Sequence, residues 1–350
     1  MVKEVNWLGD LVISLPALHA VRRRYAGAHL AVVIRAELAG FFDGIAWIDE
    51  VITYQTLRGA WRIGTNRRLI DDIRSRRFDL AILFPNSFSS ALIATLAGVP
   101  RRAGYSTDGR GLLLTDRTRP DEDALAGHQK DYWLRMVRAT VDAEYAAAGL
   151  PDDVALTAKE DHRTRIAATI EARRTRPGAP LIAIAPAAAY GPAKEWPADR
   201  FVALVDLLGE RYGAESVVVG APGETALCER IVAAASPSAA FSMAGETAVG
   251  ELIALLSVCD GFAGNDSGAM HLASALGIPT VGIFGSTNPA RTGPFGPRAT
   301  VVSNPLDCSP CLARTCRFGH YRCLGEIAPV AVAAALASTG AFGRSRRPVA

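Results

Sequence analysis

The sequence lacks a hydrophobic run long enough to cross a lipid bilayer, and it lacks a charged amino-terminal region followed by an apolar core. The first absence argues against a membrane-spanning protein and the second against an exported one, so we expect a cytoplasmic protein. An excess of one charge is also missing, because 38 Lys and Arg nearly balance 35 Asp and Glu. That balance argues against a dedicated nucleic-acid-binding protein.

Two common nucleotide-binding motifs are missing as well. No GxGxxG follows the first expected strand, which argues against a Rossmann-fold dehydrogenase. The turn at residues 264–268 does not fit the phosphate loop GxxxxGK followed by Ser or Thr. If this chain binds a phosphate group, it therefore does so without either of these two motifs.

What the sequence does contain is an alternation of short apolar runs with helical patterns in both halves, which predicts parallel sheets with crossover helices. Residues 104–125 are rich in Gly, Thr and charge and are expected to form a loop. A polar, proline-containing break at residues 173–180 is the expected linker between an amino-terminal domain, 1–172, and a carboxy-terminal domain, 181–350. The expected strands of the second domain are 181–186, 216–220, 261–264 and 280–284.

Residues 264–268, Gly-Asn-Asp-Ser-Gly, lie between an expected strand and an expected helix. The first amides of a helix lack intrahelical partners and carry partial positive charge, so they suit a phosphate group. Ser267 adds a hydroxyl donor, and His271 lies within the first helical turn. In the alternative interpretation, Asp266 or Ser267 is only a helix N-cap and His271 is a structural histidine.

The longer segment GNDSGAMHLASALGIPT at 264–280, continuing to FGST at 284–287, resembles glycosyltransferase family 9. These are the bacterial lipopolysaccharide heptosyltransferases, and the likeness is closest to heptosyltransferase II. The resemblance implies an α/β fold of GT-B architecture, with two Rossmann-like doubly wound domains facing each other across a cleft. It also implies an inverting enzyme that uses ADP-heptose as substrate and requires no metal ion or other cofactor. On the same basis, the donor-binding residues include Asp266, Ser267, Gly268 and His271.

Gly9 and Asp10 precede an apolar helical segment that contains Pro16. Asp10 could simply be an N-cap carboxylate. Glycosyl transfer, however, needs a base that removes a proton from the acceptor hydroxyl, and the segment resembles the family signature whose Gly-Asp carries the proposed catalytic aspartate. We therefore expect Asp10 to be the base. Because only eight residues precede Gly9 and Val2–Val5 makes a poor buried strand, we also expect either a sequence that begins late or a first strand near the sheet edge.

Three further residues are candidates for donor binding. Lys194 follows a strand and precedes Trp196-Pro197, and its ammonium group would suit a diphosphate leaving group. The resemblance assigns donor phosphate to this lysine, the ribose to Glu224 and the adenine pocket to Thr247. A solvated lysine, a helix-start carboxylate and an N-cap threonine are the respective alternatives.

Four cysteines cluster near the carboxyl terminus, with His320 among them, at positions Cys308, Cys311, Cys316 and Cys323. Four thiolates could form a structural zinc site, although the spacing lacks the paired CxxC motifs of zinc ribbons. Disulfides are disfavoured in the cytoplasm, and four unligated thiols are the remaining alternative. No catalytic metal is expected.

The amino-terminal domain is rich in arginine, at positions 58, 62, 67, 68, 74, 76, 77, 101, 102 and 110. If the family resemblance holds, the acceptor is the lipopolysaccharide core on lipid A, whose acidic sugars and phosphates would suit such residues. Peripheral contact with the inner membrane would then follow. Solvated helix faces are the commoner role for most of these arginines, and His128 is expected at the surface.

The sequence therefore predicts a metal-independent glycosyltransferase of lipopolysaccharide biosynthesis. One alternative keeps the fold but uses another nucleotide sugar, for capsule or glycoprotein synthesis. The other is a non-catalytic saccharide- or nucleotide-binding protein on the same fold, which the presence of both Asp10 and Lys194 disfavours.

Overall fold

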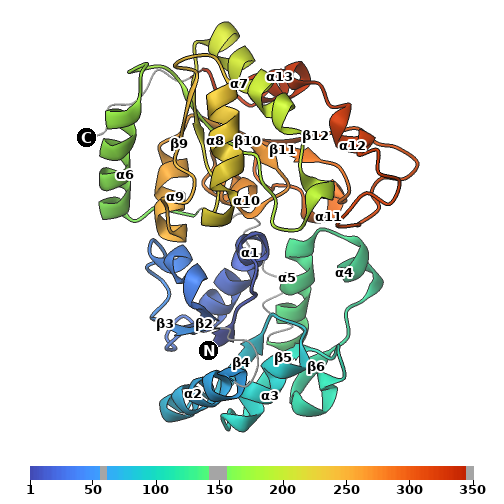
Figure 1. The fold of residues 1–350 in the computed structure, drawn as a ribbon. Coiled ribbons are helices and arrows are strands. Elements are labelled where there is room, and N and C mark those ends of the chain that lie inside the picture. Colours follow the sequence, from blue (N-terminus) through green and yellow to red (C-terminus); the bar gives the residue numbers. More distant parts are fainter. Residues whose placement is uncertain (56–60, 142–155, 344–350) are drawn as a thin grey trace. The chain divides into compact units, whose positions relative to one another are not determined.

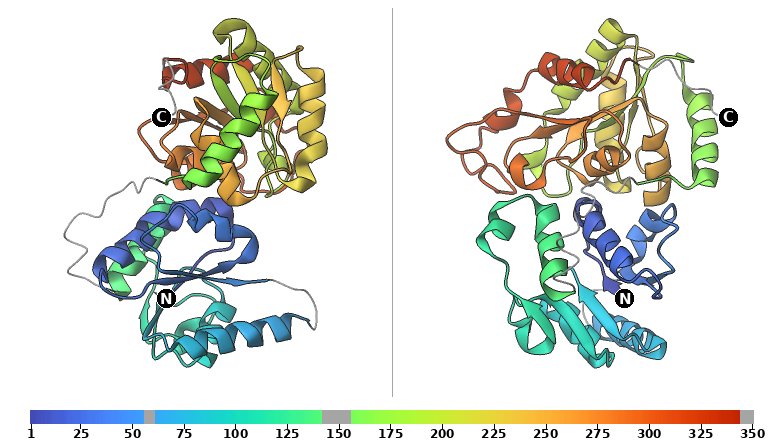
Figure 2. Two further views of the ribbon diagram at one scale, coloured as in Figure 1. Left: turned by 90° about the vertical axis from the view of Figure 1, so that its left-hand side faces the viewer. Right: turned by 180° about the vertical axis from the view of Figure 1, so that it is seen from behind.

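The computed structural model describes residues 1–55, 61–141 and 156–343, and the chain divides into two compact units, Met1–Val154 and Ala155–Ala350. Each unit contains one parallel six-stranded sheet with helices on both faces (Figures 1 and 2). Within the described ranges, no helix is both long enough and apolar enough to span a membrane.

The first sheet has the strand order β3-β2-β1-β4-β5-β6. Its strands are β1 (Val2–Lys3), β2 (Ala31–Arg35), β3 (Glu50–Tyr54), β4 (Leu80–Leu83), β5 (Arg101–Tyr105) and β6 (Asp116–Thr118). Helices α1 (Leu8–Arg24) and α5 (Gln129–Thr140) pack together on one face, and α2 (Trp61–Arg76) and α3 (Phe88–Leu96) pack together on the other (Figure 1). Shorter elements are η1 (Ala36–Phe42), η2 (Arg110–Leu113) and α4 (Glu122–Ala126).

Two expectations for this unit are corrected by the structure. Of the two alternatives for the first strand, the position near a sheet edge is wrong, because β1 pairs with both β2 and β4. Residues 104–125 are not all loop, since they contribute to β5, β6 and two short helices. β6 escaped the sequence pattern because it is a short edge strand of polar residues, where a hydrophobic alternation is not required.

The second sheet has the strand order β12-β11-β10-β7-β8-β9. Its strands are β7 (Leu181–Ala185), β8 (Glu215–Val218), β9 (Ala240–Ser242), β10 (Gly261–Asn265), β11 (Thr280–Phe284) and β12 (Ala299–Ser303). Helices α7 (Ala198–Tyr212), α8 (Thr225–Ala234) and α13 (Pro329–Ser338) cover one face with a continuous apolar core. Helices α6 (Glu160–Arg173), α9 (Val249–Ser257) and α10 (Gly268–Ala275) pack side by side on the other face. The remaining elements are η4 (Pro192–Lys194), η5 (Pro222–Glu224), α11 (Pro289–Thr292) and α12 (Arg322–Gly325).

Both sheets share the doubly wound order in which the first strand of the unit lies beside the fourth. In such sheets, the loops at the carboxyl ends of those two strands diverge and leave room for a ligand. The relevant pairs are β1 with β4 and β7 with β10. This topology confirms the predicted α/β class with two Rossmann-like domains and identifies where a site should be sought in each unit.

The expected linker at residues 173–180 lies inside the second unit. Helix α6, which precedes it, packs against α9. At its end the buried Arg174 guanidinium lies 3.2 Å from a carboxylate oxygen of Glu215 on β8. These contacts attach α6 to the second sheet, so the division between the units falls earlier in the chain than the polar break.

Candidate active site

The loops that follow β7 and β10 are tied together by one buried side chain, Asn265. Its Oδ1 accepts a hydrogen bond from the Trp196 amide at 3.0 Å, and its Nδ2 donates to the Pro186 carbonyl at 2.7 Å. Both ends of the loop after β7 are therefore held by the last residue of β10. Close approach of the strands requires glycine at Gly264, where a Cβ atom would lie 2.7 Å from the Ala185 carbonyl oxygen.

This arrangement brings Lys194 into contact with Asp266, which lies 72 residues later in the sequence. The Lys194 ammonium lies 2.5 Å from Asp266 Oδ2, and the Thr287 hydroxyl donates to the same oxygen at 2.7 Å. His271 Nε2 lies 3.9 Å from the other oxygen, Oδ1. Only 5% of the Asp266 side chain is exposed, so the carboxylate orients a lysine rather than being solvated. Sequence reasoning singled out Lys194, Asp266 and His271 but missed Thr287, whose signal was a hydroxyl in the loop that follows β11.

The amino terminus of α10 adjoins this cluster. Ser267 is the N-cap residue by backbone conformation, but its side chain makes no capping hydrogen bond. Its Oγ is buried and has no hydrogen-bond partner among the described residues. The N-cap alternative therefore does not account for the Ser267 hydroxyl. Gly268 begins the helix, so the backbone amides of its first turn are not used within α10.

Glu224 and Thr247 lie farther along the carboxyl edge of the same sheet, after β8 and β9. Glu224 Oε2 accepts a hydrogen bond from the Ala221 amide at 2.7 Å, which closes the turn at η5. Thr247 is half-buried and immediately precedes Ala248, the N-cap residue of α9. In the described structure, neither side chain is joined to the Lys194–Asp266 pair by a hydrogen bond or ion pair, so their donor-binding roles stay predictions.

In the first unit, Asp10 is half-buried in the first turn of α1, after the central strand β1. Two ionisable residues, Lys3 and Glu4, are buried next to this helix. Glu4 is fully buried, and its Oε2 accepts a hydrogen bond from Ser14 Oγ at 3.1 Å. Burial raises the pKa of Glu4 to about 7 and lowers the pKa of the adjacent Lys3 to about 7. Asp10 therefore follows a strand-to-helix turn that begins with two buried ionisable residues, Lys3 and Glu4.

His128 has a structural role at the start of α5. It is the N-cap residue of that helix, and its Nδ1 accepts a hydrogen bond from the Lys130 amide at 3.1 Å. This N-cap contact gives His128 a structural role that does not require binding of a saccharide substrate.

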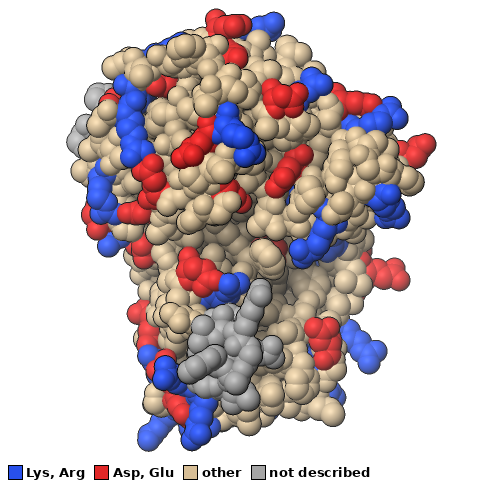
Figure 3. Space-filling view, viewed as in Figure 1, with Lys and Arg blue, Asp and Glu red and all other residues tan. Residues whose placement is uncertain are grey.

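Most of the arginines that sequence analysis noted are engaged within the first unit. Arg74 lies 2.6 Å from Asp71, Arg76 lies 2.7 Å from Glu50, and Arg101 lies 2.9 Å from Asp116. Arg110 is completely buried and donates to main-chain carbonyls. Arg58 and the side chain of Arg62 lie outside the described residues. On the face drawn in Figure 3, basic side chains are interspersed with acidic ones.

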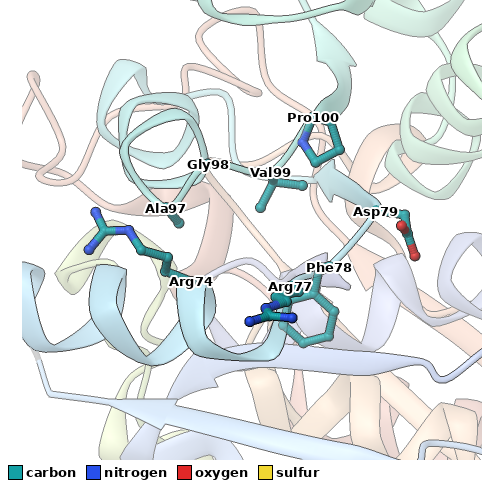
Figure 4. Close-up of a pocket in the computed structure, with 8 residues that line it drawn as sticks. All are labelled: Arg74, Arg77, Phe78, Asp79, Ala97, Gly98, Val99 and Pro100. Carbon is teal, nitrogen blue, oxygen red and sulfur yellow. The ribbon is translucent and has the colours of Figure 1, made fainter.

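A pocket beside α2 and α3 includes two of these arginines (Figure 4). Its lining residues are Arg74, Arg77, Phe78, Asp79, Ala97, Gly98, Val99 and Pro100. Asp79 directly precedes β4 and Pro100 directly precedes β5. The pocket therefore lies at the amino-terminal edge of the sheet, opposite the edge where β1 leads to Asp10.

The four clustered cysteines line one pocket together with His320, Ser286 and Ala193. All four are free thiols, and Cys323 is buried. The pKa of Cys316 is lowered by backbone amides that point at its sulfur, most of all the amide of Tyr321. The pKa of Cys323 is raised by burial. Among the described residues, no three His, Cys, Asp or Glu side chains are arranged to hold a metal ion.

Comparison with known proteins identifies the family of this chain. Residues 66–322 match the profile of Glycosyltransferase family 9 (heptosyltransferase). Lipopolysaccharide heptosyltransferase 2 from Salmonella typhimurium is 32% identical over 310 residues, which cover 85% of each chain. The protein of the same name from Escherichia coli is 29% identical, also with 85% of each chain covered.

Solved structures extend the comparison to the fold. The E. coli ADP-heptose lps heptosyltransferase II superposes with a TM-score of 0.82 at 26% identity, covering 97% of both chains. A family 9 glycosyl transferase from Veillonella parvula gives a TM-score of 0.83 at 23% identity, covering 97% of this chain and 96% of the other. The chain therefore belongs to glycosyltransferase family 9, the heptosyltransferases, and is a glycosyltransferase of GT-B fold.

Proposed function

We propose that this enzyme transfers heptose, with inversion, from ADP-heptose to the inner core of lipopolysaccharide. The observation that carries the proposal is the Lys194–Asp266–Thr287 cluster beside the unpartnered Ser267 hydroxyl at the start of α10. The relatives named above supply the sugar and the acceptor, because their names specify heptose and lipopolysaccharide.

The donor half of the reaction belongs to the second unit. A nucleoside diphosphate placed at the amino terminus of α10 would accept hydrogen bonds from backbone amides and from Ser267. Lys194 would place its positive charge on the same diphosphate, and Asp266 with Thr287 holds that ammonium in position. These groups would stabilise the negative charge that develops on the departing ADP.

The acceptor half is assigned to Asp10. The acceptor hydroxyl oxygen forms a bond to the anomeric carbon while the bond from that carbon to the diphosphate oxygen breaks. The hydroxyl proton passes to the Asp10 carboxylate, and the bonding electron pair leaves with ADP. Attack from the face opposite the leaving group inverts the anomeric centre. A carboxylate in a helix first turn is well suited to remain ionised before the reaction.

The acceptor would reach the enzyme as a core saccharide on lipid A, at the cytoplasmic face of the inner membrane. Exposed arginines of the first unit, such as Arg68 and Arg77, would contact its anionic groups. Peripheral membrane contact is part of this proposal, and sedimentation with vesicles containing the acceptor tests it.

The four-cysteine pocket takes no part in the proposed reaction. A structural zinc ion is the candidate metal for it, and four unligated thiols are the alternative. Four thiolates are a set that Zn²⁺ prefers. Binding would have to draw the sulfur atoms closer together than they lie here. Measurement of zinc in the purified chain, compared with a Cys316→Ser variant, tests this assignment, and a zinc-free native protein with full activity rejects it.

A thermal-shift comparison tests the function as a whole. ADP and ADP-heptose should raise the melting temperature far more than UDP or GDP and their sugars, because at equal concentration the ligand with the lower dissociation constant stabilises the folded state more. Asp10→Asn should keep the ADP shift but lose transfer by about a thousandfold or more, since the base alone is removed. A preference for UDP or GDP would favour the alternative nucleotide sugars. Turnover at the native rate in Asp10→Asn would reject Asp10 as the base.

A further inference from the structure

Residues 312–315, between the second and third clustered cysteines, form a segment that we call the cysteine segment. It lies against the loop of residues 186–197 after β7, which we call the donor loop. The Arg314 carbonyl accepts a hydrogen bond from the Ala193 amide at 3.0 Å. The Tyr190 hydroxyl donates to the Leu312 carbonyl at 2.8 Å. The Leu312 amide in turn donates to the Ser286 carbonyl at 2.7 Å, next to Thr287. The segment is therefore fixed to both loops that position the Lys194–Asp266 pair.

The donor loop is built for this close approach. Gly191 has φ of 142°, in the region that favours glycine. A Cβ atom on this residue would lie 2.7 Å from the Arg314 carbonyl oxygen. Glycine at this position lets the backbone of the donor loop touch the backbone of the cysteine segment, which places the Arg314 side chain beside the site.

Two cations meet at one aromatic ring in this arrangement. The guanidinium carbon of Arg314 lies 4.8 Å from the centre of the Tyr190 ring, and Lys194 Nζ lies 5.0 Å from the same point. Lys194 is neutralised by Asp266. In the described part of the chain, the Arg314 guanidinium has no carboxylate partner, and its only hydrogen bond, of 3.4 Å, runs from Nη1 to the Tyr190 carbonyl.

We propose that Arg314 is a second cation for the diphosphate of the nucleotide-sugar donor, with Tyr190 as the platform that orients it. The inference rests on the proposed function and adds to it a residue that the sequence analysis did not single out. Arginine suits this task because its planar guanidinium can donate two parallel hydrogen bonds to phosphate oxygens and stays charged at any working pH. Stacking on an aromatic ring reduces the freedom that the side chain would lose on binding.

The hydrogen bonds that join the two backbone segments do not use the Arg314 guanidinium. Tyr190 and Ala193 are bonded to main-chain carbonyls of the segment, so removing the guanidinium leaves that framework in place. The matched control is Arg317, an exposed arginine directly after Cys316. Among the described residues, its guanidinium reaches only the Cys311 carbonyl, at 3.5 Å.

The test measures dissociation constants of ADP, AMP and adenosine by calorimetry for the wild-type chain, Arg314→Gln and Arg317→Gln. Arg314→Gln should weaken ADP binding by roughly 10- to 100-fold, the usual range for one charge-assisted hydrogen-bonding group. It should leave adenosine binding unchanged, and Arg317→Gln should bind all three ligands as the wild type does. Arg314→Lys should recover part of the loss.

Each other outcome has a definite meaning. Wild-type affinity for ADP in Arg314→Gln overturns the inference, and so does an equal loss for ADP and adenosine, which would indicate a disordered loop. If UDP binds in place of ADP but with the same dependence on Arg314, the donor assignment fails while the role of Arg314 stands. If the wild-type chain binds no nucleoside diphosphate, the proposed function and the inference fail together.

Discussion

Asp266 is the buried carboxylate that links the loops after β7, β10 and β11 at one edge of the second sheet. The sequence indicated a polar residue between a strand and a helix, which a phosphate site or a simple cap explains equally well. In the structure its carboxylate instead bridges Lys194 and Thr287. That role requires the loops after β7, β10 and β11 to lie together at one edge of the sheet, and a local sequence pattern does not predict contacts between distant loops. Thr287 was missed for the same reason.

Glu4 gives a residue-scale prediction about pH. Its pKa is raised from 4.5 to about 7 by burial, so between these pH values the unfolded chain loses the proton while the folded chain keeps it. Stability from this group is complete below pH 4.5 and is lost as pH rises toward 7. Glu4→Gln should remove that loss, which is at most about 3 kcal/mol.

The measurement is the free energy of unfolding of Glu4→Gln and the wild-type chain by denaturant titration at pH 5 and pH 7. The advantage of the variant should be larger at pH 7. Lys3, whose pKa is lowered to about 7, acts in the opposite direction and mainly above pH 7, outside the chosen window. Replacement of the exposed Glu229 by Gln should give the same difference at both pH values. An equal effect of Glu4→Gln at both would contradict the assignment.

At the scale of elements, hydrophobic patterns predicted the buried strands of the second unit to within a few residues, because parallel strands covered on both faces are continuous apolar runs. The expected strand at 280–284 coincides with β11, and the expected helix at 268–276 ends one residue beyond α10. β1 was underestimated because two charged residues are buried at its end. The Lys3 ammonium donates to the Glu4 carbonyl and the Glu4 carboxylate accepts from the Ser14 hydroxyl, and no hydropathy pattern reveals these hydrogen bonds.

The donor loop supports an element-scale prediction at Gly191. Alanine at this position would adopt a strained φ of 142°, and its Cβ would lie 2.7 Å from the Arg314 carbonyl. The loop and the cysteine segment should separate, with a loss of stability of about 1–3 kcal/mol. ADP affinity should fall by about tenfold or more, because Lys194 and Arg314 would no longer be held together.

Gly178→Ala is the matched control for that experiment. Gly178 also has positive φ, 81°, but a Cβ there would meet nothing within 4 Å, and the residue lies outside the donor loops. It should cost stability without changing ADP affinity. If both variants lost ADP affinity equally, backbone strain alone would explain the loss and the contact between loop and segment would have no role in binding.

At the scale of the whole molecule, the class of fold and the presence of two units followed from the repeated alternation of strands and helices. The bounds of the units did not, because a polar break is only a weak sign of a boundary. Residues 173–180 resemble a linker in composition, yet Arg174 makes a buried ion pair with Glu215 on β8. Such a pairing between distant residues becomes visible only when the chain has folded.

The division of labour between the two units gives a prediction for the full chain. Every contact that positions Lys194 lies within the second unit, whereas Asp10 lies in the first. Saturating ADP should therefore slow hydrogen exchange of backbone amides at residues 186–196, 264–268, 285–287 and 309–314, because binding suppresses local opening of these loops. The amides of α1 should exchange at the same rate with and without ADP. Exchange followed by mass spectrometry measures this, and Asp10→Asn should give the same map as the wild type. If ADP protected α1 and left residues 309–314 unchanged, donor binding would have to be reassigned to the first unit, because a ligand held by Lys194 and Arg314 must order the segment that carries them.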